Sequence, residues 1–130
     1  MSEFSKALSV TSSGLKAQAT RLRHLSENIS NADTPGYRRK LVAFEAAFDQ
    51  SQGVSKVEAS RVRLDRSELE RIYDPSHPLA DGSGHYDGSN VDLLIELGDA
   101  REAQRSYEAN LKVFEQTRKM SSSLMDLLRK

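Results

Sequence analysis

The sequence predicts a mainly α-helical protein whose long N- and C-terminal helices pair as an antiparallel coiled coil around a small irregular or β middle segment. Two observations predict this fold. Apolar residues recur at helical spacing at both ends of the 130-residue chain, and turn-forming residues crowd the stretch between them. We therefore divide the chain into 1–36 as an N-terminal helix and turn, 37–90 as a middle segment of short strands and loops, and 91–130 as a C-terminal helix. Segments 1–36 and 91–130 are expected to form one core domain.

The N-terminal helix is predicted by apolar residues at intervals of seven. These residues are Leu8, Leu15, Leu22 and Ile29, with Leu25 and Ala32 at the companion position. Such a heptad pattern is typical of a helix that packs against another helix, and it predicts a helix over about 5–32. Thr11 and Gln18 occupy the companion position earlier in the segment, so the first half of the seam is polar.

A stop and a turn follow this helix at Asn31, Ala32, Asp33, Thr34, Pro35, Gly36 and Tyr37. The ring of Pro35 removes a backbone donor and disfavours the helical conformation for Thr34. Gly36 permits a positive φ.

The middle segment carries weaker signals. Residues 41–48 fit either a helical turn or a strand, 54–64 alternate like a short twisted strand, and 74–89 are dense in turn formers and predict a loop. The basic run Arg38-Arg39-Lys40 is expected to be a solvated loop or to pair with a neighbouring molecule.

The C-terminal helix is predicted by a spacing that alternates between four and three. It is carried by Leu93, Leu97, Ala100, Gln104, Tyr107, Leu111, Phe114, Arg118, Ser121, Met125 and Leu128. Ser89, followed by Asp92 three residues later, predicts a capping-box-like start. A second apolar set at Ala103, Val113, Met120, Leu124 and Leu127, interrupted by Asn110, widens the stripe and predicts more than one packing partner. An intramolecular helical hairpin is the alternative, but Gln104, Arg118 and Ser121 within the seam favour multimeric packing.

Composition limits the function classes. Nineteen basic and nineteen acidic residues cancel, which argues against nucleic acid as a partner, and the absence of cysteine excludes thiolate chemistry. No apolar run reaches the length of a membrane span, so no membrane insertion is expected. His24, His77 and His85 lack metal-binding spacing. We predict no enzyme activity, no cofactor and no metal.

Three motifs resemble the axial proteins of the bacterial flagellum. Residues 31–37 resemble the family signature Asn-Ala-Asn/Asp-Thr-Pro-Gly-Tyr, and 25–32 resemble the helix that leads into it. Residues 106–111 resemble the C-terminal Tyr-x-Ala-Asn motif, and 74–78 are similar to a segment of the proximal rod proteins. The entry to the last helix, residues 88–91, departs from the Pro-Asn-Val of those proteins.

The resemblance implies a structural subunit of the proximal rod of the flagellar basal body. Such a subunit would pass unfolded through the flagellar type III export apparatus, assemble in the periplasm and polymerise through its terminal helices into the torque-transmitting drive shaft. Its partners would be further copies of itself, the proximal and distal rod subunits and the rod-base adaptor FliE. Residues 35–37 would fix the angle at which the middle segment leaves the helix, and Asn28, Asn31 and Asn110 would satisfy backbone or cross-subunit hydrogen bonds.

The expected subunit interface comes from both helices. It comprises Leu8, Leu15, Leu22, Leu25, Asn28, Ile29, Leu93, Leu97, Tyr107, Asn110, Leu111, Phe114, Met125 and Leu128. Two alternatives stay open at this point. One is a soluble helical adaptor or export chaperone that binds partner helices as an ordered dimer, and the other is an axial junction protein at another level of the flagellar shaft.

Overall fold

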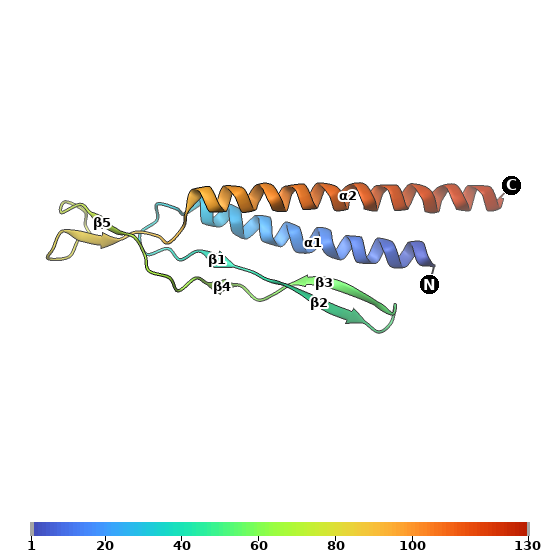
Figure 1. Ribbon diagram of the computed structural model, residues 1–130, viewed down its shortest axis with the longest axis horizontal. Coiled ribbons are helices and arrows are strands. Elements are labelled where there is room, and N and C mark those ends of the chain that lie inside the picture. The colour runs from blue at the N-terminus through green and yellow to red at the C-terminus, as the bar shows by residue number, and fades with distance from the viewer. Residues whose placement is uncertain (1, 130) are drawn as a thin grey trace.

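The computed structural model describes residues 2–129 and has two long helices with a strand-containing middle segment between them. The elements are α1 (Glu3–Ser30), β1 (Lys40–Leu41), β2 (Phe44–Asp49), β3 (Val54–Ala59), β4 (Arg63–Leu64), β5 (Arg71–Tyr73), β6 (His85–Asp87) and α2 (Leu93–Arg129). The molecule is elongated, with α1 and α2 side by side and the β5–β6 arm projecting beyond them (Figure 1). The predicted fold class is confirmed.

Helix α1 begins at a serine cap and ends at the predicted turn. The Ser2 hydroxyl accepts a hydrogen bond from the Ser5 amide at 3.1 Å, which satisfies one of the free donors of the first turn. The helix ends at Ser30, two residues before the predicted boundary. Gly36 has φ of +75°, as predicted, and its amide donates to the Gly88 carbonyl at 3.0 Å. The turn therefore fastens the end of α1 to the segment that enters α2.

Helix α2 starts differently from the prediction. Asp92 is the cap, because its Oδ1 accepts from the Leu94 amide at 3.0 Å. Ser89 does not cap the helix: its hydroxyl donates to the Ala32 carbonyl and accepts from the Val91 amide at 3.3 Å. Asp92 directly precedes the first helical residue, whereas Ser89 lies in the connection that crosses the end of α1.

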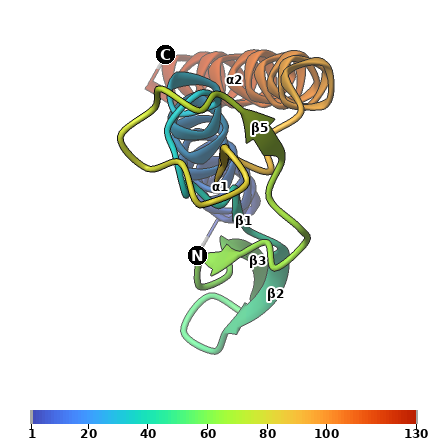
Figure 2. The ribbon, with the colours of Figure 1, turned by 90° about the vertical axis from the view of Figure 1, so that its left-hand side faces the viewer.

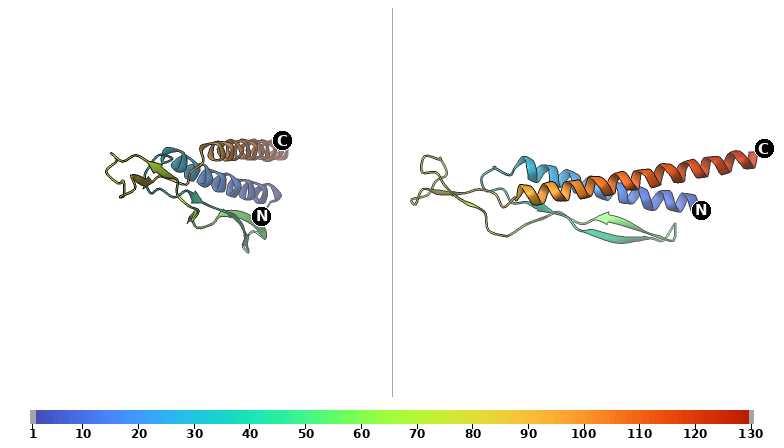
Figure 3. Two further views of the ribbon diagram at one scale, coloured as in Figure 1. Left: turned by 60° about the vertical axis from the view of Figure 1, so that its left-hand side comes forward. Right: turned by 45° about the horizontal axis from the view of Figure 1, so that its top comes forward.

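The two helices run antiparallel, and α2 is the longer. Gly14 faces the Asn110 amide group, and Asn28 faces Glu96. Continued along the helices, this register places Glu3 opposite Ser121, so the last turns of α2 extend past the start of α1 (Figure 3). We call residues 122–129 the α2 overhang.

The strands form three separate two-stranded antiparallel sheets, β1–β4, β2–β3 and β5–β6. Residues 41–48, which fitted a turn or a strand, contain β1 and β2, and the strand expected over 54–64 is divided into β3 and β4. The loop expected over 74–89 contains β6, because His85 pairs with Tyr73. Sheet β2–β3 packs along α1 on the side away from α2 (Figure 2).

The apolar core is small. Among residues 2–129 the buried apolar side chains are Ala17, Leu25 and Ala103. Two of these three residues are small, and the large apolar side chains other than Leu25 are left at least partly exposed.

Candidate assembly interface

A cluster of polar side chains joins the end of α1 to the start of α2. We call it the polar clamp, and its members are Asn28, Tyr37, Arg39, Lys40 and Glu96. Asn28 is fully buried and donates through Nδ2 to the Lys40 carbonyl at 3.0 Å and to Glu96 Oε2 at 3.2 Å. Its Oδ1 accepts from the Tyr37 hydroxyl and from the Lys40 amide, each at 2.8 Å. One side chain therefore connects both helices and the chain that leaves the turn.

Glu96 is the only fully buried carboxylate among the described residues, and its charge is balanced within the clamp. Arg39 Nε donates to Glu96 Oε1 at 2.6 Å. The same guanidinium reaches Asp65 Oδ2 at 3.4 Å and lies 4.0 Å from Asp99 Oδ2. A buried carboxylate without such a partner would be strongly destabilising, so Arg39 and Glu96 depend on each other.

A second ion pair lies beside the clamp. Lys40 Nζ donates to Glu27 Oε2. This hydrogen bond lowers the pKa of the Glu27 carboxyl below its usual value and raises the pKa of the Lys40 ammonium. Burial raises the pKa of the Tyr37 hydroxyl, which keeps it a neutral donor to Asn28.

The basic run does not form the solvated or neighbour-pairing loop that we expected. Arg38 Nη1 donates to the carbonyls of Asp65 and Ser67, at 3.2 and 2.9 Å, and Arg39 and Lys40 bind the carboxylates described above. The acids that neutralise the run lie 13 to 60 residues away in the sequence, and local charge patterning therefore could not reveal them.

The residues predicted to face other subunits fall into three groups. Leu25 and Asn28 are buried inside this chain, and Asn28 makes backbone hydrogen bonds with Lys40, which was one of the two roles expected of it. Others are half-buried: Leu8, Leu15, Leu22, Ile29, Tyr107, Asn110, Leu111 and Phe114. The exposed members are Leu93, Leu97, Met125 and Leu128, at 47%, 49%, 52% and 73%.

The exposed members belong to two apolar patches at opposite ends of α2. The head patch comprises Leu93, Leu94, Ile95 and Leu97, and the tail patch comprises Met120, Leu124, Met125, Leu127 and Leu128, all at least 45% exposed. The prediction missed Leu94 and Ile95. The signal was present, because four apolar residues among five cannot all lie on one face of a helix.

Exposed apolar patches beside a thin core are typical of a protein that packs against other chains, and the sequence comparisons agree with this interpretation. Residues 8–38 match the family model described as flagella basal body rod protein, and residues 83–127 match the model described as flagellar basal body rod FlgEFG protein C-terminal. The chain is 46% identical to the flagellar basal-body rod protein FlgC of Agrobacterium fabrum, over 99% of this chain and 98% of that protein. The chain belongs to the flagellar basal-body rod protein family.

More distant rod proteins also align along most of their length. The FlgC proteins of Salmonella typhimurium and Bacillus subtilis are 31% and 29% identical to this chain, over 91% and 93% of it. As a member of this family the chain is a structural rod subunit and not an enzyme. These relatives favour the rod subunit over the adaptor or chaperone.

Residues 2–129 contain neither a metal-binding cluster nor a helix that could span a membrane. No group of three or more His, Asp or Glu side chains is arranged to hold a metal ion. No described helix has both the length and the apolar character needed to span a membrane. His77, one of the loop histidines, instead stacks on Tyr86 with ring centroids 3.8 Å apart.

Proposed function

We propose that the chain polymerises as a proximal rod subunit through the apolar patches at the two ends of α2. The observation that carries this proposal is the position of the patches. A tail patch on one copy that packs on the head patch of the next copy, or of a neighbouring rod protein, makes a heterologous contact, and such contacts build open helical polymers. A self-complementary patch would instead favour a closed dimer.

Burial of the tail patch would contribute substantially to the free energy of the contact. Each of the five tail-patch side chains keeps about half or more of its surface exposed. Full burial of a large apolar side chain contributes about 1.5–3 kcal/mol, so covering the remaining half of five side chains contributes about 4–7 kcal/mol. This gain is comparable to the stability of a marginal domain, and assembly would therefore stabilise the subunit itself.

The small core also fits the expected route. A chain with three buried apolar side chains among its described residues has little apolar burial to lose when it unfolds. We propose that it travels unfolded through the flagellar type III export apparatus, assembles where the rod spans the periplasm, and meets the rod-base adaptor FliE and other rod subunits there. Segments 1–36 and 91–130 would form the axial core, with 37–90 as an outer appendage.

Charge placed in the tail patch tests the proposal. In a strain that lacks the native protein, Leu128→Glu and Met125→Glu should abolish rods in isolated basal bodies, because each puts a carboxylate in an apolar contact. Ser123→Glu adds the same charge to the same exposed turn, outside the patch, and should leave rods intact. The proposal would be overturned by normal rods from both patch variants. A discrete soluble dimer of the wild-type chain would also overturn it and would favour the soluble adaptor instead.

A further inference from the structure

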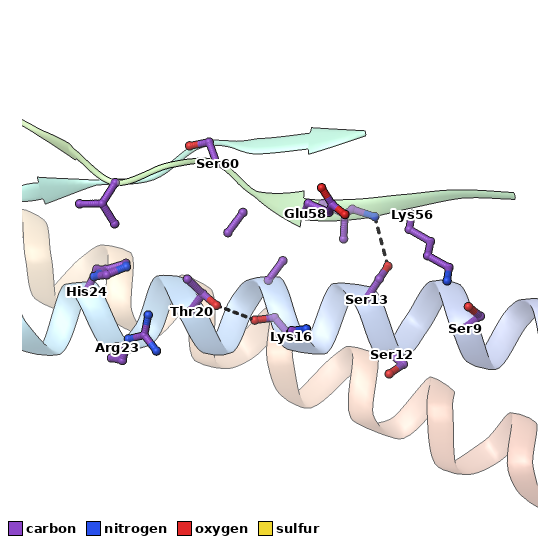
Figure 4. A pocket seen from close by; sticks show the side chains of 14 residues that line it. Ser9, Ser12, Ser13, Lys16, Thr20, Arg23, His24, Lys56, Glu58 and Ser60 are labelled. Atoms are coloured by element: carbon purple, nitrogen blue, oxygen red, sulfur yellow. Dashed lines mark hydrogen bonds between the residues drawn. The ribbon is translucent and has the colours of Figure 1, made fainter. Parts of the chain in front are cut away.

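The outer edge of β2 has no partner strand. β3 pairs with β2 on one side, and on its other side it lies along α1, where the Ser13 hydroxyl accepts a hydrogen bond from the Val57 amide at 3.1 Å (Figure 4). Next to β2, the Ser60 amide donates to the Ala43 carbonyl at 2.7 Å. In an antiparallel ladder such bonded pairs alternate with pairs whose backbone groups point outward. The residues of β2 that point away from β3 are therefore Phe44, Ala46 and Phe48.

This free edge of β2 is apolar and unprotected. Phe44, Ala46 and Phe48 are all exposed, Phe48 at 65%, and their outward backbone groups have no hydrogen-bond partner within residues 2–129. Natural proteins usually protect a sheet edge with lysine, proline, a bulge or a covering segment, because an open edge pairs with other chains. β2 contains neither lysine nor proline, and its register with β3 has no bulge.

A second open edge lies on the β5–β6 arm. The Asp74 amide donates to the Gly84 carbonyl at 2.9 Å, so Asp74 faces β6. The alternate residues Arg71 and Tyr73 therefore direct their backbone groups away from β6, and nothing in the described part of the chain bonds to these groups. The Tyr73 side chain is 67% exposed, and Leu79 near the tip of the arm is exposed as well. The arm thus presents a free strand edge with apolar side chains.

The two open edges lie at opposite ends of the molecule. The arm projects beyond the head patch, whereas β2 lies beside the helix pair toward the tail patch (Figure 1). Ala46 pairs with Val57, which lies next to Gly14, and Gly14 faces Asn110. Asn110 precedes Met125 of the tail patch by about 22 Å of helix, at about 1.5 Å per residue. The edge of β2 therefore lies about 22 Å inward from the tail patch.

The arm has the length and the direction needed to reach this edge. The stretch from Glu70 to Leu79 can span up to about 30 Å, at about 3.3 Å per residue. β5 runs away from the helices, because the Glu70 amide before it donates to the Ser89 carbonyl near the start of α2. β2 runs toward the start of α1, because Gln52 in the turn after it accepts from the Ser9 hydroxyl at 2.6 Å. In copies that point the same way, β2 and β5 are therefore antiparallel.

We infer that the arm of one copy adds β5 to the open edge of β2 in the next copy, so that β3, β2, β5 and β6 form one four-stranded antiparallel sheet across two subunits. The inference rests on the proposed function, because the head-to-tail contact brings the arm to β2. A two-stranded sheet is only marginally stable alone, whereas three or more strands with an apolar face are stable. Backbone hydrogen bonds would supply affinity, and Phe48 and Tyr73 would supply specificity.

Cysteine cross-linking in isolated basal bodies tests the inference, since the natural chain has no cysteine. Ala46→Cys combined with Tyr73→Cys places one thiol on each edge, and a short bismaleimide should join neighbouring copies into a ladder of multimers. The two positions lie at opposite ends of one molecule (Figure 1), so the product must join different copies. Lys112→Cys combined with Tyr73→Cys is the matched control. Lys112 is exposed on α2 at a level similar to that of β2, and this pair should give no ladder.

A proline at position 71 provides an independent readout. The Arg71 amide points away from β6, so Arg71→Pro keeps the β5–β6 ladder but removes a donor to the next copy. It should lower the yield of the Ala46–Tyr73 product about tenfold, the effect of about one lost hydrogen bond. Arg71→Ala also loses the ion pairs with Asp81 and Asp87, but it keeps the amide and should retain most of the yield.

Three outcomes, each with the chain present in intact rods, would overturn the inference alone. They are a ladder of equal yield from the control pair, no ladder from the Ala46–Tyr73 pair, and an equal yield with proline and with alanine at position 71. Where the cysteine variants do not enter rods, the number of rods from Arg71→Pro and Arg71→Ala in the cysteine-free chain decides, and equal numbers would overturn the inference. Absence of the wild-type chain from basal bodies would overturn the proposed function as well.

Discussion

Replacing Asn28 with alanine tests whether the polar clamp holds the helix pair together. The side chain makes four hydrogen bonds, to the Lys40 carbonyl and amide, the Tyr37 hydroxyl and the Glu96 carboxylate. A neutral hydrogen bond contributes about 0.5–1.5 kcal/mol and one to a charged group about 1.5–3 kcal/mol. We expect Asn28→Ala to lower the free energy of unfolding by about 4 kcal/mol.

The assay is urea unfolding of the purified, dilute chain, followed by circular dichroism. Because the apolar core is small, about 4 kcal/mol is a large fraction of the roughly 5–15 kcal/mol of a typical domain. Asn31→Ala is the matched control. Its side chain donates to the Glu27 carbonyl at 2.8 Å and accepts from Thr34 at 3.0 Å, near the surface, so it should cost about 1 kcal/mol. Equal losses of unfolding free energy in the two variants, with an unchanged slope of that free energy against urea concentration, would refute the reasoning.

Three further predictions concern the same region. Gly36→Val should lower the urea midpoint of unfolding and block rod assembly, because a β-branched residue is strained at φ of +75°. Gly36→Asn should be tolerated much better in both assays. Arg39→Met should lower the free energy of unfolding by about 3–5 kcal/mol by leaving the Glu96 carboxylate buried without its partner; the double variant with Glu96→Gln should recover part of the loss in the same urea assay. The Glu27–Lys40 pair should contribute its full stabilisation between the ordinary pKa values of 4.5 and 10.5. Below that range the Glu27 contribution is lost as pH falls through the lowered pKa of Glu27, and above it the Lys40 contribution is lost as pH rises through the raised pKa of Lys40. Lys40→Met should flatten the pH dependence of the urea midpoint at both edges of that window, and an unchanged profile would contradict it.

Helical periodicity was enough to predict the two helices and their pairing. The heptad at Leu8, Leu15, Leu22 and Ile29 marks the length of α1 to within two residues, since a pattern of period 3.5 has no counterpart in strands or loops. The positive φ of Gly36 was also predictable, because the turn after Pro35 needs a residue without a side chain.

The contacts of the clamp were not predictable in this way. Asn28 and Glu96 are 68 residues apart in the sequence, and no motif or spacing relates them. Glu96 interrupts an apolar run, a position where a carboxylate suggests a solvated face, yet it is fully buried. Only the antiparallel register places it against Arg39, and register is a long-range property that one sequence does not display.

The clamp and the overhang lie at opposite ends of the helix pair, and we therefore expect the pair to unfold from the overhang end toward the clamp. At one end, a network of short hydrogen bonds and ion pairs fixes α1, the turn and α2. Near the middle of the pair the small Gly14 faces Asn110, and at the other end the overhang has no opposing helix. Thermal unfolding should begin by fraying at the free ends of both helices and should proceed toward the clamp. Amide exchange in the isolated chain should then show protection that falls from residues 25–30 toward residue 3 and from residues 96–103 toward residue 129.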